Sequence, residues 1–223
     1  MKESMQTQTE LLPDNEDFSS ALIAEPEMYS APVSDEDQHR SAAYSLLAAL
    51  LRQPPDTEIL QHVGQFAEVQ PENDDLSIAM NMLGLSASSS KLDVLDDEFH
   101  ALFIGLGRGE LVPFGTWYQT GFLMERPLGI LREDLKKLGY ERDDGVHEPE
   151  DHIAALCEVM AMLILDGRSH GVQQNFFNVH LQSWVSKFFN DLVNADNASF
   201  YRSVGRFGLA FSAFEERYFS MQA

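Results

Sequence analysis

The fold is decided by residues 148–167, which read EPEDHIAALCEVMAMLILDG. After the acidic start, apolar residues recur every three or four positions, a spacing that places them on one face of an α-helix. Pro149 suits the first turn of such a helix and Gly167 suits its end, so the pattern predicts a helix between them. The apolar tract 153–165 contains Glu158 and is shorter than the roughly 20 residues that cross a bilayer. We therefore expect this helix to lie in a protein core.

The same spacing recurs along most of the chain. Most of these runs stop at a proline or a glycine, which break helices, and no segment shows the strict alternation of a β-strand. The further runs that we expect to be helical are 43–51, 59–67, 76–83, 92–103, 128–138, 176–192 and 204–218. Loops are expected at 105–115 and 140–147. The sequence therefore predicts an all-α fold, a single-domain bundle of about eight to ten helices.

The first 33 residues differ from the rest of the chain. Residues 1–40 hold ten acidic residues against two basic ones, with prolines at 13, 26 and 32 and few apolar residues. Such a composition is typical of a disordered segment. We expect a disordered acidic tail over 1–33 and a helical domain over 34–223. A solvated tail and a docking or autoinhibitory arm both remain open.

The overall composition excludes several classes of partner. The chain has 223 residues, 15 of them Lys or Arg and 36 Asp or Glu, for a formal net charge of −21. A nucleic-acid binder needs a basic stripe and an anionic membrane surface repels negative charge, so we expect no nucleic-acid partner and no membrane insertion. The N-terminal sequence lacks the features of a signal peptide, which predicts a cytoplasmic protein. The single cysteine, Cys157, excludes an internal disulfide.

Motifs for catalysis or metal binding are weak. Gly105, Gly107 and Gly109 alternate beside Arg108, but they follow a helical run, whereas a dinucleotide-binding glycine motif follows a strand. A helix end and a turn explain these glycines equally well. The histidines around Cys157 lack the spacing of zinc ligands, and no nucleophile motif occurs. We expect no catalytic residues and no metal site.

Two other clusters could form a binding site. The glycine-rich segment 105–115 runs into the aromatic residues Phe114, Trp117 and Tyr118, which could line an apolar peptide groove or belong to the core. The acidic residues of 148–151 could stabilise the positive end of a helix or bind a cationic partner.

The two clusters resemble the TorD/DmsD/NarJ family of redox-enzyme maturation chaperones. The family's second motif, Glu-Pro-x-Asp-His before an apolar helix, is reproduced fully, whereas Phe114 and Thr116 stand where the family commonly has Tyr and Ser. The resemblance covers about residues 38–220 and leaves the tail outside it. The matching motifs are Phe99-x-x-Leu102-Phe103-x-Gly105, then Leu111-x-Pro113-Phe114-x-Thr116-x-Tyr118, and Glu148-Pro149-Glu150-Asp151-His152-Ile153 with Met160 downstream.

The resemblance implies an all-helical, non-enzymatic chaperone. Such proteins bind the twin-arginine signal peptide, or another segment, of a molybdenum- or tungsten-containing oxidoreductase and delay its export until the cofactor is inserted. Some relatives bind guanine nucleotide weakly and some form domain-swapped dimers, so weak GTP binding and either a monomer or a swapped homodimer are expected. With the two flanking carboxylates added, the expected peptide-binding residues are Phe99, Leu102, Phe103, Pro113, Phe114, Tyr118, Glu148, Glu150, Asp151 and His152.

Elementary chemistry supports this expectation. A twin-arginine signal joins cationic residues to an apolar stretch, so carboxylates at Glu148, Glu150 and Asp151 can bind its guanidinium groups while aromatic side chains take the apolar part. Two alternatives remain: a helical protein that binds or hydrolyses guanine nucleotide, and an acidic scaffold without a groove. The scaffold predicts that Phe99, Phe103 and Phe114 are all fully buried.

Overall fold

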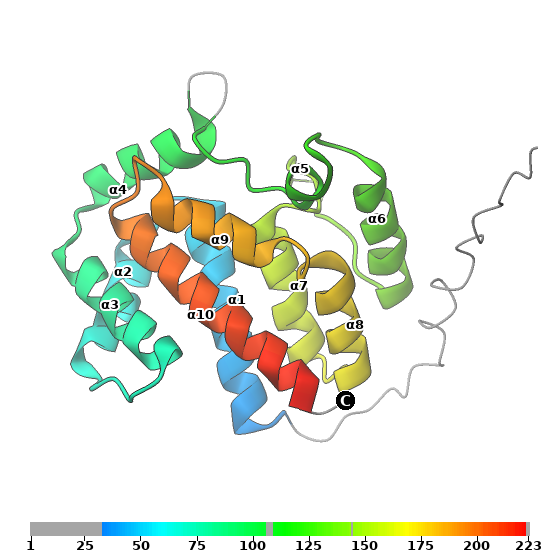
Figure 1. Ribbon diagram of the computed structural model, residues 1–223, viewed down its shortest axis with the longest axis horizontal. Coiled ribbons are helices and arrows are strands. Elements are labelled where there is room, and N and C mark those ends of the chain that lie inside the picture. The colour runs from blue at the N-terminus through cyan, green and yellow to red at the C-terminus, as the bar shows by residue number, and fades with distance from the viewer. Residues whose placement is uncertain (1–32, 106–108, 144, 222–223) are drawn as a thin grey trace, which may run out of the picture.

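A computed structural model describes residues 33–105, 109–143 and 145–221. These residues form ten α-helices (Figure 1) and no β-strand, only an isolated bridge between Phe114 and His152. The all-α prediction is confirmed. The helices are α1 (Asp35–Arg52), α2 (Thr57–Gly64), α3 (Asp75–Ser89), α4 (Leu92–Phe99), α5 (Gly115–Thr120), α6 (Arg126–Leu138), α7 (Ile153–Leu165), α8 (His170–His180), α9 (Val185–Asn194) and α10 (Phe200–Met221).

The expected acidic tail, 1–33, lies outside the described residues except for Val33. Two short helices extend the regular ones: a 3-10 helix, η1 (Gln65–Glu68), follows α2, and a π-helix, η2 (His100–Ile104), follows α4.

The centre of the bundle is α7. Its residues are apolar on every side except at Glu158, and most of them are buried, as expected for a helix enclosed by others. Helix α1 packs along α7, and α10 packs against α9, α3 and α1. In Figure 1, α2–α4 gather on one side of this core and α5, α6 and α8 on the other.

A buried ion pair joins the first and last helices. The Arg40 guanidinium on α1 donates to both carboxylate oxygens of Glu215 on α10, at 2.7 and 2.8 Å, and Tyr44 Oη donates to the same carboxylate at 3.0 Å. Gln173 on α8 accepts a further bond from Arg40 at 3.0 Å. Arg40 and Glu215 are 2% and 0% exposed. Because the charges compensate each other, the pair fixes how three helices meet.

A second carboxylate connects the helix of the first motif to the start of α10. Glu98 Oε1 accepts from the backbone N–H groups of Ser199 and Tyr201 at 2.7 and 2.8 Å. These N–H groups have no partner within a helix, so Glu98 caps α10 from a distant part of the chain.

Two helix boundaries differ from the sequence prediction. The run 176–192 is not one helix: α8 ends at His180, whose carbonyl accepts from the Trp184 indole at 2.7 Å, and α9 starts at Val185. The third helix continues through Gly84 to Ser89. A side chain at Gly84 would collide with the η1 backbone, so this glycine allows close helix packing rather than ending the helix.

Candidate functional site

The acidic motif forms a turn before α7 rather than the first turn of that helix. Helix α7 begins at Ile153, and the N–H of His152 donates to the Pro149 carbonyl at 3.1 Å to close the turn. The expectation that the motif carboxylates lie in the first helical turn is therefore wrong. The N-cap is His152, whose Nδ1 accepts from the N–H of Ala154 at 3.1 Å. This bond leaves the proton of a neutral ring on Nε2.

The two motifs meet through a short antiparallel pairing of backbone. The N–H of Ile153 donates to the Pro113 carbonyl, and the N–H of Gly115 donates to the Asp151 carbonyl, both at 2.9 Å. The rings of Phe114 and His152 lie edge to face across this pairing, with centroids 5.1 Å apart. Segments 35 or more positions apart in sequence are thus held as one unit.

Asp151 caps α5. Its Oδ2 accepts from the backbone N–H and the hydroxyl of Thr116, at 2.8 and 2.6 Å. The residue is 4% exposed, and within the described part of the chain its Oδ1 has no hydrogen-bond partner. Asp151 also lines a small cavity of about 100 Å³ between α5, α6, α7 and α8. Its hydrogen bonds fix the start of α5 against α7.

Burial keeps His152 neutral. Desolvation lowers the pKa of its imidazole to about 4, although nearby Glu148 opposes the shift. At neutral pH the ring therefore accepts at Nδ1 and can donate at Nε2.

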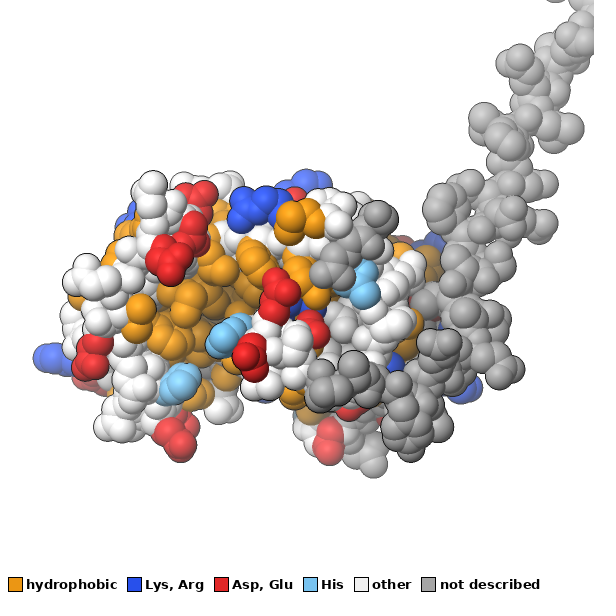
Figure 2. All heavy atoms as spheres, turned by 90° about the horizontal axis from the view of Figure 1, so that it is seen from below, with side chains coloured by type: hydrophobic (Ala, Val, Ile, Leu, Met, Phe, Trp, Pro, Cys, Tyr) orange, Lys and Arg blue, Asp and Glu red, His pale blue; other side chains and the backbone are white. Residues whose placement is uncertain are grey.

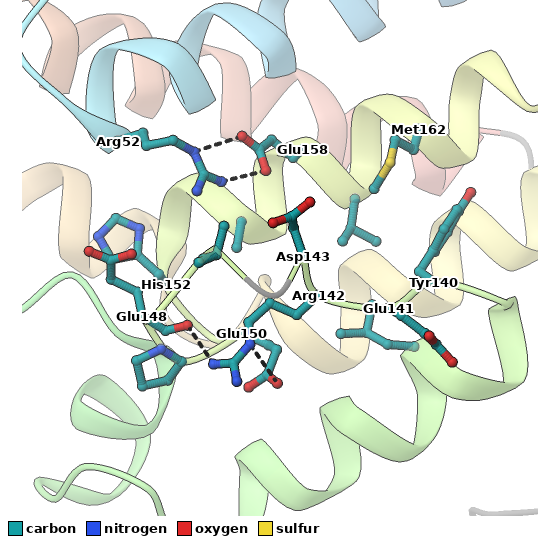
Figure 3. Close-up of a pocket in the computed structure, with 15 residues that line it drawn as sticks. Arg52, Tyr140, Glu141, Arg142, Asp143, Glu148, Glu150, His152, Glu158 and Met162 are labelled. Carbon is teal, nitrogen blue, oxygen red and sulfur yellow. Dashed lines mark hydrogen bonds and ion pairs between the residues drawn. The ribbon is translucent and has the colours of Figure 1, made fainter.

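His152 opens onto a pocket of about 270 Å³ between the 140–150 loop, the end of α1 and one face of α7 (Figure 3). Five carboxylates and two guanidinium groups line it, together with an apolar wall. The lining residues are Arg52, Leu135, Tyr140, Glu141, Arg142, Asp143, Val146, Glu148, Pro149, Glu150, His152, Ala155, Glu158, Val159 and Met162. The pocket therefore combines excess negative charge with apolar surface.

The two arginines of the pocket are already paired. Arg52 Nε donates to Glu158 at 2.8 Å, as Figure 3 shows above the pocket. Arg142 Nε lies 3.9 Å from Glu150 Oε1. Arg132 Nη2 binds the other oxygen of the same carboxylate, Oε2, at 2.8 Å. Burial alone would raise the pKa of Glu150. The hydrogen bond and the positive charges of these arginines outweigh the effect of burial, so the pKa of Glu150 is lowered.

Three other carboxylates of the pocket have no cationic partner. Glu141, Asp143 and Glu148 are all exposed, and none of these carboxylates forms an ion pair with another described residue. Asp143 Oδ1 accepts from the backbone N–H of Gly145 at 2.7 Å. Arg142 binds only the backbone carbonyl of Glu148, at 3.1 Å. Glu148 lines the pocket next to His152, as Figure 3 shows.

The structure places Phe99 and Leu102 in the core and packs Phe103 and Tyr118 against it. Phe99 and Leu102 are 5% and 0% exposed, and Phe103 packs on Phe99 and Tyr201. Tyr118 stacks on Trp184, with centroids 5.6 Å apart.

The remaining predicted residues are divided between core and pocket. Pro113 is buried, whereas Phe103 and Phe114 keep some exposure, so the groove-free scaffold's prediction of three fully buried rings is not met. Of the ten predicted residues, the structure brings Glu148, Glu150 and His152 together in the pocket.

The glycine run has structural roles at two of its positions. Gly105 ends the π-helix with φ 57°, and the missing side chain of Gly109 lets the chain return against the Leu102 carbonyl. Residues 106–108, including Gly107 and Arg108, lie outside the described part of the chain. Within the described part, no three histidine, cysteine or acidic residues form a group that could hold a metal ion.

Sequence reasoning missed the cations of the pocket and the partner of Asp151. Arg52 comes from α1 and Arg142 from the loop after α6, and neither belongs to a motif. Thr116 could have been found, because it lies in the first motif as a hydroxyl residue at the start of a short helix.

Comparison with known proteins gives concordant matches. The nitrate reductase delta subunit family matches residues 67–190. A chaperone protein TorD from Vibrio atlanticus is 27% identical over 206 residues, covering 82% of this chain and 95% of the relative. A chaperone protein TorD from Aliivibrio fischeri is 27% identical over 191 residues, covering 75% and 88%.

A solved structure shares the fold. It is described as a redox enzyme maturation protein from Archaeoglobus fulgidus, with a TM-score of 0.51 at 19% identity, covering 85% of this chain and 98% of that one. None of the helices that the structure describes has the length and hydropathy to cross a membrane.

Proposed function

The chain belongs to the nitrate reductase delta subunit family, the group of non-enzymatic maturation chaperones that includes TorD, and from this premise we propose that it binds the twin-arginine signal peptide of its client. The client would be a molybdenum- or tungsten-cofactor oxidoreductase in its apo form. We propose further that binding takes place in the cytoplasm, that residues 34–223 form the chaperone domain, and that an occupied chaperone delays export until the cofactor is inserted.

One observation carries the proposal: the family motif opens onto a pocket with more carboxylates than arginines and with an apolar wall. A guanidinium group forms short, charge-assisted hydrogen bonds to carboxylates. Leu135, Val159 and Met162 offer apolar contacts beside those carboxylates. A peptide that carries arginines next to an apolar stretch matches both parts of the pocket.

Each polar residue of the pocket would make a different contact with the peptide. Glu148 and Glu141, which form no ion pair among the described residues, would contact the arginines. Glu150 is already held by Arg132 and Arg142, and would exchange partners with an incoming guanidinium. His152 would donate from Nε2 to a peptide carbonyl, since Nδ1 is occupied by the cap.

Asp151 would act as a positioning residue. Its bonds to Thr116 hold the two motifs together, and its burial keeps it from the pocket mouth. Phe99 and Leu102, which lie in the core, and Pro113, through its carbonyl, would support the same framework.

Isothermal titration of the full chain against twin-arginine signal peptides tests the proposal. The peptides would come from oxidoreductases of the source organism, each paired with a version in which both arginines are lysines. We expect micromolar or tighter binding to one peptide and weaker binding to its Lys-Lys version, because lysine cannot make the paired bonds of a guanidinium.

Absence of binding to every peptide would contradict the proposal. A rise in melting temperature with magnesium-GTP in that case would favour the nucleotide alternative, since a ligand of the folded state stabilises it by mass action.

A further inference from the structure

An apolar groove lies on the other half of the molecule, away from the motif pocket. Its volume is about 580 Å³, and it runs between α1, the α2–η1 segment, α3 and α10. The residues that line it are Glu36, His39, Arg40, Ala42, Ala43, Leu46, His62, Phe66, Leu76, Met80, Phe207, Phe211 and Phe214. Within the described part of the chain it is larger than the motif pocket.

The walls of the groove are incompletely covered. Leu46, Phe66, Leu76, Met80 and Phe214 pack against the core on one side but remain only partly buried. Figure 2 shows hydrophobic side chains gathered in a hollowed area on the half of the molecule formed by α1–α3 and α10. Apolar surface concentrated in one concave place favours an apolar occupant.

The described chain begins at the mouth of this groove. Helix α1 starts at Asp35, after the cap residue Ser34, and Glu36 and His39 in its first turns line the groove. The segment that precedes α1 in the sequence is therefore joined to the fold next to this groove. A segment of the same chain reaches such a site at a high effective concentration, which a separate partner lacks.

The chain before α1 contains one short apolar run. Residues 18–24 read FSSALIA, with Glu16 and Asp17 before them and Glu25 and Pro26 after them. Phe18 and Leu22 are four positions apart, so they lie on one face if the run is helical. We propose that residues 18–24 bind in the apolar groove of their own chain, with Phe18 and Leu22 as the anchors.

The connecting segment is long enough for this arrangement. From Glu36 to Leu46 the groove follows α1 for about 15 Å, at about 1.5 Å per residue. The ten residues 25–34 span up to about 33 Å when extended, so the chain can reverse at the mouth and run back along α1. Pro26 and Pro32 in this connection favour extended or turn conformations over helix.

The two histidines of the groove suit the acidic flanks of the run. His39 on α1 and His62 on α2 both line the groove and both are exposed. Their ring N–H groups can donate to the carboxylates of Glu16, Asp17 or Glu25. The docked segment would cover the apolar walls and exclude other apolar helices from them.

Disulfide trapping in the full chain tests the proposal. Leu22→Cys is combined with Met80→Cys in the groove wall, and the control pair combines Leu22→Cys with Val94→Cys, which is 53% exposed on α4 outside the groove. The native Cys157 is buried, and desolvation raises its thiol pKa, so it does not compete. A third variant adds Phe18→Asp to the first pair.

We expect the intrachain disulfide between positions 22 and 80 to form at least ten times faster than the one between positions 22 and 94. Adding Phe18→Asp should slow the formation of the 22–80 disulfide at least tenfold. Equal rates in the three variants would overturn the proposal, because they indicate random collisions of a free tail. A disulfide between two chains would also overturn it, since a second copy would then occupy the groove.

Leu76→Cys replaces Met80→Cys if the latter alters the circular dichroism spectrum. No client peptide enters this experiment, so its failure leaves the proposed signal-peptide binding untouched.

Discussion

The motif pocket and the apolar groove differ in the number of charged side chains that line them and in how those charges are paired. In the pocket, five carboxylates and two arginines surround the opening, and Glu141 and Glu148 are exposed there without an ion pair among the described residues. The groove is larger. The buried Arg40 in its lining is paired with Glu215 in the core, whereas Glu36, His39 and His62 in the same lining are exposed.

This difference indicates two kinds of occupant. A site with available carboxylates can select a cationic peptide, because a guanidinium group is desolvated only where it gains charged partners. A site whose walls are mainly half-buried Leu, Met and Phe side chains selects mainly for apolar shape. Under the two proposals, one bundle would hold a selective site for a client and a less selective groove for a segment of its own chain.

The largest expected effect comes from removing the partner of Arg40, which lines the groove. Glu215→Ala leaves the buried Arg40 guanidinium without its main partner, and the loss of one member of a buried pair costs about 3–5 kcal/mol. We expect urea denaturation to show a fall in the free energy of unfolding of this size. Glu216→Ala, at the exposed neighbouring position, should change it by less than about 0.5 kcal/mol.

Equal stability of the Glu215→Ala and Glu216→Ala variants would contradict this account of the groove, because the Arg40 charge would then not depend on Glu215. Its ion pair with Asp37, at 2.8 Å, and its cation–π contact with Tyr218, 3.9 Å from the ring centroid, would then stabilise the charge instead.

The next effect concerns acid stability at the pocket. The folded protein keeps His152 neutral down to a pKa of about 4, whereas the unfolded chain binds the proton near pH 6.5. As pH falls between these values the unfolded state takes up the proton first, so the free energy of unfolding falls by up to about 3 kcal/mol. It is fully regained above pH 6.5.

His152→Asn keeps an N-cap side chain but does not titrate. We expect the loss of stability between pH 6.5 and 4.5 to be about 2 kcal/mol smaller in this variant than in the wild type, as measured by denaturation at each pH. Parallel pH profiles would show that His152 is not desolvated in the folded state.

A smaller effect tests whether Asp151 positions the two motifs or contacts the peptide itself. Asp151→Ala removes both hydrogen bonds to Thr116 and with them the cap of α5, which should lower the free energy of unfolding by about 1–3 kcal/mol. Glu133→Ala, at an exposed position on α6, is the matched control and should have almost no effect. If Asp151→Ala weakened peptide binding with no loss of stability, Asp151 would contact the client directly.

The sequence predicted the helices better than it predicted the surroundings of the motif. The apolar periodicity of α7 and α10 is a local property, so it is visible without the fold. The break between α8 and α9 depends on the Trp184 indole reaching the His180 carbonyl, and Gly84 looked like a helix end because its neighbour η1 is not visible in the sequence. Such tertiary contacts override local signals.

For the candidate site, sequence reasoning named two segments that the structure brings together, but not the orientation of each side chain. Glu148, Glu150 and His152 line the pocket as a continuous motif suggests, whereas Asp151 between them turns into the core toward Thr116. The arginines could not be found, because Arg52 reaches the pocket only through the packing of α1 on α7.

The most direct test of the account is a double-mutant cycle between Glu148 and the peptide arginines. Isothermal titration would compare wild type and Glu148→Gln against a twin-arginine peptide and its Lys-Lys version, with Glu133→Gln as the control. We predict that Glu148→Gln weakens binding of the twin-arginine peptide about five- to tenfold, or about 1 kcal/mol, and hardly affects the Lys-Lys peptide. Equal losses for both peptides, or no loss for either, would contradict the claim that this pocket recognises the arginines.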